Sequence, residues 1–151
     1  MRNSSLQFYG LFVIFVGILA TAAACLGVAF GLGLLNANGH LSLRNALFLR
    51  DALFFLLLGI GALRSGGRIR HYSRAALVGW EWVCWTIAIL VLITTLAAIA
   101  LVNVGVEYLV FTLFYLLLAT SASSVRRRNQ GFFDYRNRTT LVGNQPGSIR
   151  P

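Results

Sequence analysis

Residues 75–102 read AALVGWEWVCWTIAILVLITTLAAIALV, a run of 28 residues that contains one charge, Glu81, and no proline. At about 1.5 Å per residue, a helix of this length more than crosses a hydrocarbon layer of about 30 Å. Four arginines lie in the segment just before it, RSGGRIRHYSR at residues 64–74. Because Lys and Arg concentrate in short cytoplasmic loops, the run predicts a transmembrane helix that begins on the cytoplasmic side.

The composition of the whole chain agrees with a membrane protein. Of its 151 residues, 58% are hydrophobic and 11% are charged, and the mean hydropathy is +0.75. A small water-soluble domain cannot bury this much apolar surface, because its surface is large for its volume. The net charge of +9 flanks the apolar runs and forms no groove with interleaved aromatic residues, which argues against a nucleic-acid partner.

Three more apolar runs have the length and composition of membrane spans, and all four spans are expected at about residues 8–35, 45–63, 75–102 and 108–124. Turn signals separate them at NANGH, residues 36–40, and at NVGVE, residues 103–107. The sequence therefore predicts an all-α integral membrane protein with four transmembrane helices in two antiparallel hairpins. The transmembrane domain covers residues 8–125, between a short head at residues 1–7 and a basic tail at residues 126–151.

The arginines orient this arrangement. Eleven of the thirteen fall on one side, at positions 2, 64, 68, 70, 74, 126, 127, 128, 136, 138 and 150, and only Arg44 and Arg50 are near the other. Both termini are therefore expected in the cytoplasm of a multi-pass protein, most simply in a prokaryotic plasma membrane. A cleaved signal peptide, with Ala22-Ala23-Ala24-Cys25 as a cleavage or lipidation site, is an alternative for the first run, but this run is much longer than a signal core.

Small residues recur every four positions in the first span. Ala23, Gly27 and Gly31 form one such series, and Thr21, Cys25, Ala29 and Gly33 form another. Small side chains allow the backbones of two membrane helices to approach closely. We predict a helix-packing face at Ala23, Gly27 and Gly31, with a partner in the same chain or in another.

Two charges interrupt the second span, Arg50 and Asp51. Counting thirteen residues back from Arg64 places Asp51 roughly 20 Å from the cytoplasmic boundary, where ionisable groups are costly and are usually paired or functional. Arg50 is expected to extend outward to the headgroups. Asp51 is then expected to need water or a donor from another helix, either as a structural pair or as an ion or substrate site.

The third span begins with Trp80-Glu81-Trp82-Val83-Cys84-Trp85. Trp80, Trp82 and Trp85 are expected at the membrane interface, where the indole N–H reaches water or headgroups. Glu81 is about 9 Å along the helix, so an ion pair with Arg74 or with the run 126–128 is predicted. A proton or cation site, or a polar wall of a quinone or lipid pocket, is the alternative role of Glu81.

The basic segments are expected to contact lipid. Arg64–Arg74 includes a flexible turn at Ser65-Gly66-Gly67, and it should attract anionic headgroups together with Arg126–Arg128. In the tail, three aromatic residues are candidate anchors for the membrane surface or for another subunit: Phe132, Phe133 and Tyr135. The tail is too short to form a core, so it should be disordered alone or ordered by a partner.

No motif for chemistry is present in the sequence. There is no Cys-x-x-Cys, no histidine pair for a metal and no nucleophile beside a base, so no cofactor is expected, although a lipid, quinone or pigment at the helix surface stays open. Cys25 and Cys84 are placed at different depths and are interpreted as small buried hydrophobic residues.

Two classes of function follow. The favoured one is a non-catalytic structural or accessory subunit, or an assembly factor, that packs with other subunits of a larger membrane complex. The alternative is a small homo-oligomeric transporter or channel with Arg50 and Asp51 lining the path and Glu81 as a further candidate. It must be an oligomer, because one four-helix chain has too little interior for a pore.

Overall fold

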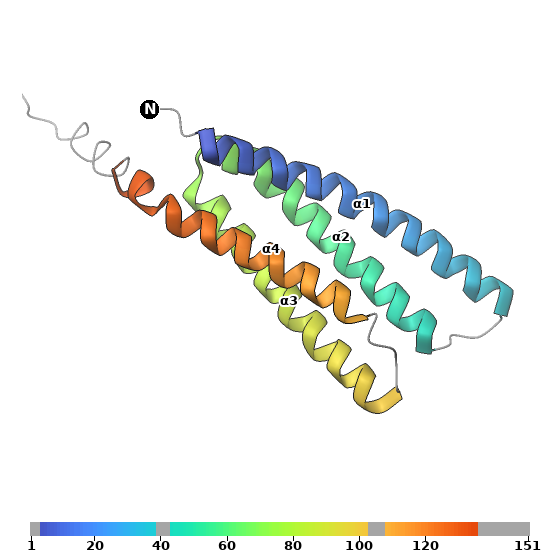
Figure 1. Ribbon diagram of the computed structural model, residues 1–151. Coiled ribbons are helices and arrows are strands. Elements are labelled where there is room, and N and C mark those ends of the chain that lie inside the picture. The colour runs from blue at the N-terminus through green and yellow to red at the C-terminus, as the bar shows by residue number, and fades with distance from the viewer. Residues whose placement is uncertain (1–3, 39–42, 103–107, 136–151) are drawn as a thin grey trace, which may run out of the picture.

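The computed structural model describes residues 4–38, 43–102 and 108–135, and these residues form long helices (Figure 1). The four elements are α1 (Ser4–Asn38), α2 (Leu43–Arg70), α3 (Arg74–Val102) and α4 (Tyr108–Arg128). Each contains a stretch long and apolar enough to cross a membrane. The described residues confirm the all-helical prediction and the four helices that are long and apolar enough to span a membrane. Residues 36–38 of the predicted outer turn belong to α1 instead, because this helix continues to Asn38. Residues 39–40, the expected outer turn at residues 103–107 and the tail beyond residue 135 lie outside the described residues.

The helices extend further than the apolar runs. The predicted flexible turn at Ser65-Gly66-Gly67 is wrong, because α2 continues through these residues to Arg70. Gly66 lies against α1 so closely that an added Cβ would come 3.0 Å from the carbonyl oxygen of Gly10. The glycine therefore serves helix packing here, since its lack of a side chain allows the two backbones to meet.

The connection between α2 and α3 has only three residues, His71, Tyr72 and Ser73. Tyr72 adopts a left-handed conformation with φ of 63°, its N–H donates to the carbonyl of Ile69, and the N–H of Ser73 donates to that of Arg68. This pattern is a Schellman motif, which satisfies the last carbonyls of a helix. Ser73 also caps α3, because its hydroxyl accepts from the N–H of Ala76 at 3.3 Å.

Helix α1 packs along α2 (Figure 1), and several glycines of α1 lie at close contacts between the two helices. An added Cβ at Gly10 would meet the backbone of Arg70, one at Gly17 would meet Ala62, and one at Gly27 would meet Ala52. The partner numbers fall as the α1 numbers rise, so the two helices pass each other in opposite directions.

The hydrophobic core occupies one half of the length of the bundle. It combines the first half of α1, α3 as far as Val91, the second half of α2, α4 from Tyr115 onward and Phe133 beyond α4. Its largest fully buried side chain is Trp80. Many large apolar side chains elsewhere are exposed, including Phe8, Leu26, Ile93 and Leu117. Apolar exposure on this scale is unusual for a soluble monomer and is what a lipid-facing surface requires.

Candidate functional site

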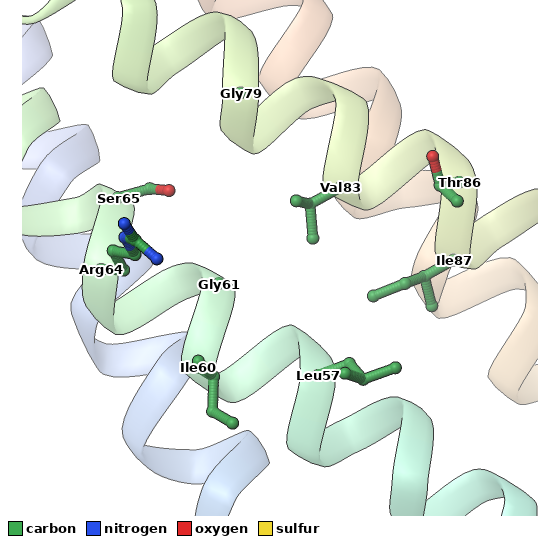
Figure 2. Close-up of a pocket in the computed structure, with 9 residues that line it drawn as sticks. All are labelled: Leu57, Ile60, Gly61, Arg64, Ser65, Gly79, Val83, Thr86 and Ile87. Atoms are coloured by element: carbon green, nitrogen blue, oxygen red, sulfur yellow. The ribbon is translucent and has the colours of Figure 1, made fainter.

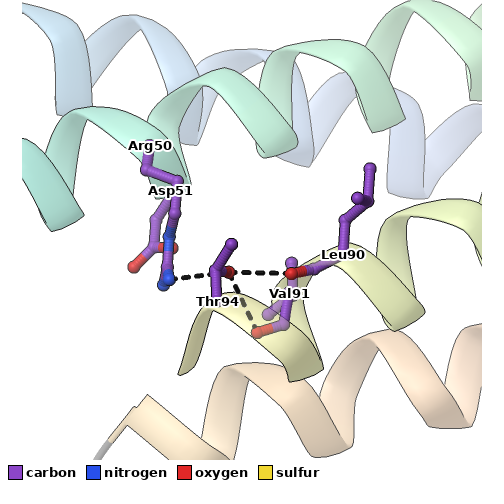
Figure 3. A network of polar contacts seen from close by, with 5 residues as sticks. All are labelled: Arg50, Asp51, Leu90, Val91 and Thr94. Carbon is purple, nitrogen blue, oxygen red and sulfur yellow. Dashed lines mark hydrogen bonds and ion pairs between the residues drawn. The ribbon is translucent and has the colours of Figure 1, made fainter. Parts of the chain in front are cut away.

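The first charged site links α2 to α3 and is called here the Arg50 cluster, comprising Arg50, Asp51 and Thr94 (Figure 3). Arg50 donates to one carboxylate oxygen of Asp51, from Nε at 2.9 Å and from Nη2 at 2.6 Å. Its Nη1 donates to the hydroxyl of Thr94 on α3 at 2.9 Å. The side chains of Arg50 and Asp51 are only 15% and 13% exposed, so most of the ion pair is buried within the protein.

This geometry corrects the expected positions of both charges. Arg50 does not extend away from Asp51, and Asp51 takes its donors from the neighbouring residue instead of from another helix. The long, flexible arginine side chain folds back along α2, which helical spacing alone does not reveal because adjacent residues point in different directions. The link to another helix exists, but it is made by Arg50.

The hydroxyl of Thr94 accepts a hydrogen bond from Arg50 and also lies within hydrogen-bonding distance of carbonyl oxygens of its own helix. Its hydroxyl lies 2.8 Å from the carbonyl oxygen of Leu90 and 3.2 Å from that of Val91, to which it can donate its single hydrogen (Figure 3). The same oxygen accepts from Arg50. A threonine hydroxyl can bond to carbonyls of its own helix within an apolar run, so the sequence gives no sign of the contact with Arg50.

The second charged site lies between α3 and α4 and is called the Glu81 cluster, comprising Glu81, Trp85, Ser123 and Arg126. Glu81 pairs with Nε of Arg126 at 2.5 Å, which confirms the predicted ion pair with the run 126–128. Ser123 donates to the other carboxylate oxygen of Glu81 at 2.7 Å and accepts from the indole N–H of Trp85 at 2.9 Å. Every member is thus held by another member of the cluster.

The two partners of this ion pair are unequally buried, which predicts unequal effects of mutation. The Glu81 side chain is 11% exposed and that of Arg126 is 45% exposed. In Arg126→Gln a buried carboxylate loses its counter-charge, which we expect to cost about 2 kcal/mol of unfolding free energy. In Glu81→Gln the freed arginine can turn to water or headgroups, so the expected cost is within about 1 kcal/mol.

The measurement is unfolding in mixed micelles, followed by helical circular dichroism. Arg127→Gln is the matched control, because Arg127 is exposed one residue away. Equal losses for Arg126→Gln and Arg127→Gln would contradict a structural role of the ion pair.

The three tryptophans differ in environment. Trp82 is 70% exposed and Trp85 is half-buried, as an interfacial position allows. Trp80 is 1% exposed and lies in the core, so its expected interfacial role is wrong. Its indole N–H donates to the hydroxyl of Tyr9 on α1 at 3.3 Å, which replaces the contact with headgroups.

The predicted packing face of α1 is divided between two environments. Gly27 and Gly31 lie against Ala52 and Leu49 of α2, whereas Ala23 is exposed and lines an apolar groove beside α4. Of the second series, Cys25, Ala29 and Gly33 are all exposed, and an added Cβ at Gly33 would meet nothing within 4 Å. This exposed series is called the outer stripe.

The aromatic residues of the tail are largely used within the chain. A helical turn at residues 130–135 follows α4, and in it Phe133 is 4% exposed and belongs to the core. The ring of Phe132 lies 5.6 Å from that of Tyr72. Only Tyr135, at 65% exposure, stays on the surface, so the expectation of a tail that is disordered alone is wrong up to this residue.

The cysteines and the possible metal ligands form no site in the described part of the chain. Cys84 is buried as expected, whereas Cys25 is exposed because it lies on the outer stripe, and both thiols are free. The described residues include no group of three or more His, Cys, Asp or Glu that could hold a metal ion.

Comparisons with protein-family models, with curated proteins and with solved structures found no match. The class of the protein therefore rests on its own features. Four apolar helices and two internally paired charge clusters define a small multi-pass membrane protein.

Proposed function

We propose that the chain is a non-catalytic accessory or structural subunit, or an assembly factor, that packs against other subunits of a membrane complex. In this proposal the four helices cross a plasma membrane of prokaryotic type as two antiparallel hairpins, with both termini in the cytoplasm. The arginine distribution supports that orientation, because Arg64, Arg68, Arg70 and the run 126–128 follow or precede spans at the same end of the bundle.

The observation that carries the proposal is that each of the two largely buried carboxylates, Asp51 and Glu81, forms an ion pair with an arginine of the same chain. Arg50 neutralises Asp51, and Arg126 neutralises Glu81, each within hydrogen-bonding distance. A carboxylate that serves transport or catalysis must exchange ions or protons with its surroundings. Here both oxygens of Glu81 and one oxygen of Asp51 are bonded to side chains of their own chain. The described part of the chain therefore offers its surroundings mainly apolar helix surface.

The outer stripe indicates where a partner helix would pack. Cys25, Ala29 and Gly33 are small, exposed and on one face of α1, while the series at Gly27 and Gly31 already contacts α2. Lipid provides no hydrophobic drive for helix association, so close backbone approach over small residues is a main source of affinity.

The test is purification from the native membrane in a mild detergent, with sizing and mass-spectrometric identification of whatever co-migrates. We expect other polypeptides in fixed stoichiometry, and we expect Ala29→Leu to remove them while leaving the chain folded. Ala97→Leu on the exposed side of α3 is the matched control. A pure homo-oligomer, or loss of partners with both variants alike, would refute the subunit role as stated.

A second candidate is a homo-oligomeric transporter or channel in which Arg50, Asp51 and Glu81 line the path. One observation favours it: the buried hydroxyls of Thr95 and Tyr115 have no hydrogen-bond partner among the described residues. Unsatisfied hydroxyls inside a membrane protein are costly and can mark a place that water or an ion enters. Such a path would have to open the ion pair of Arg50 and Asp51.

A further inference from the structure

A groove between α2 and α3 has Arg64 and Ser65 at one end, mostly apolar side chains along its length, and Thr86 of α3 near the other end (Figure 2). Its volume is about 500 Å³, which lies in the range of small-molecule sites, about 300–1,000 Å³. Leu57, Val83 and Ile87 point into the space between the helices, and Arg64 and Ser65 lie at one end.

The direction of this polarity matches one leaflet of a bilayer. Arg64 marks the level at which the apolar part of α2 ends, and Leu57 lies seven residues earlier, about 10 Å deeper in the membrane along the helix. A phospholipid has the same order, with a phosphate at the surface and an acyl chain that runs toward the midplane. A groove that was apolar throughout would show no such preference for an amphiphile.

The guanidinium group of Arg64 is available to an anion from outside the described residues. Three carboxylates are described, and each is paired with a different arginine: Asp51 with Arg50, Glu81 with Arg126, and Asp134 with Arg74. Arg64 has no ion pair or hydrogen bond within the ranges that the structure covers, and it is exposed at the end of the groove. A lipid phosphate would complete the bonding of its guanidinium group.

Gly79 on α3 leaves open space in the groove, because an added Cβ there would meet nothing within 4 Å. Gly61 on α2 also lines the groove, but an added Cβ there would come 3.2 Å from the side chain of Val83. The space beside Gly79 therefore belongs to the groove and is not filled by a neighbouring side chain. A larger residue at this position would enter the groove without disturbing the packing of the helices.

We propose that this groove binds one anionic phospholipid of the cytoplasmic leaflet. Its phosphate contacts Arg64 and Ser65, and an acyl chain lies along Leu57, Val83 and Ile87. The proposal rests on the membrane orientation proposed above, and it does not depend on the subunit role.

The experiment is native mass spectrometry of the purified full chain in detergent micelles. Dioleoyl phosphatidylglycerol and dioleoyl phosphatidylcholine, which share their acyl chains, are titrated separately. We expect one phosphatidylglycerol per chain to be retained in preference to phosphatidylcholine. Arg64→Gln should weaken its retention about fivefold, the effect of about 1 kcal/mol per basic residue at a membrane surface. Gly79→Leu should weaken retention of both lipids by filling the groove.

Two variants serve as matched controls. Arg68→Gln removes an exposed arginine one turn along α2, and Gly67→Leu adds the same side chain at another open glycine, both away from the groove lining. Equal weakening by Arg64→Gln and Arg68→Gln would overturn the site in favour of diffuse attraction to the basic surface. Unchanged binding in Gly79→Leu would overturn the acyl groove, and a change of oligomeric size in this variant instead would show that a second copy occupies it.

Discussion

Replacing Arg50 by methionine is expected to lower the free energy of unfolding by about 3 kcal/mol, because Asp51 is left as an uncompensated buried charge. Asp51 is only 13% exposed, and both of its hydrogen bonds in the described structure come from Arg50. The same substitution at exposed Arg68 is the matched control and should change stability little. The measurement is unfolding in mixed micelles of rising denaturing-detergent content, followed by circular dichroism.

The double variant Arg50→Met/Asp51→Leu should be far less destabilised than the single one. Apolar replacement of a buried ion pair removes the desolvation cost of both charges, so it is often neutral. We expect the double variant to lie within about 1 kcal/mol of the unchanged protein, a strong departure from additivity between neighbours. Additive losses would show that Arg50 and Asp51 do not stabilise one another.

The same residues distinguish the two candidate functions. If Arg50 and Asp51 are a structural pair, Asp51→Asn should alter stability or assembly while the reconstituted protein carries no ion or solute flux that depends on this residue. If they line a path, Asp51→Asn should abolish flux and leave expression and assembly unchanged. Flux measured across proteoliposomes decides between these results.

The second large effect is expected at Gly10. An added Cβ there would come 2.8 Å from the backbone nitrogen of Arg70 and 2.9 Å from the carbonyl oxygen of Gly66. Both contacts are with backbone, which cannot move aside as a flexible side chain can. Gly10→Val should therefore separate α1 from α2 and cost about 3 kcal/mol of unfolding free energy, at the upper end for overpacked sites.

Gly33→Val on the same helix is the matched control, because an added Cβ at Gly33 would meet nothing within 4 Å. The control also corrects for the change in helix propensity, which is the same at both positions. Gly10→Ala gives a milder version of the clash if the valine variant does not accumulate. Equal stability of the Gly10 and Gly33 variants would contradict the close approach of the two backbones.

Some contacts of the charged residues could be predicted from the sequence, and others could not. The ion pair of Glu81 with the run 126–128 was predictable, because both lie near the same membrane boundary and opposite charges there have few other partners. The particular contacts that Thr94 and Ser123 make were not predictable, since each hydroxyl lies on a helix whose rotation about its axis is fixed only by packing. The fold-back of Arg50 depends on its side-chain conformation, which spacing along a helix does not specify.

The small residues of α1 likewise separate what the sequence predicts from what only packing decides. Small residues at intervals of four in α1 predicted a packing face, but two such series exist, and the sequence treats them alike. The structure places Gly27 and Gly31 against α2 and leaves Cys25, Ala29 and Gly33 exposed. The difference arises from residues of α2 that fit one series, and such complementarity between distant segments has no local signature.

The sequence by itself determined the class of the protein and the approximate course of its four spans. Long apolar runs must form helices in lipid, because the membrane interior offers no other partner for backbone N–H and C=O groups. Only the tertiary structure decided which faces meet, where the core lies and how Arg50 and Glu81 are neutralised. These features depend on the mutual rotation and approach of helices, which are set by contacts between residues far apart in the chain.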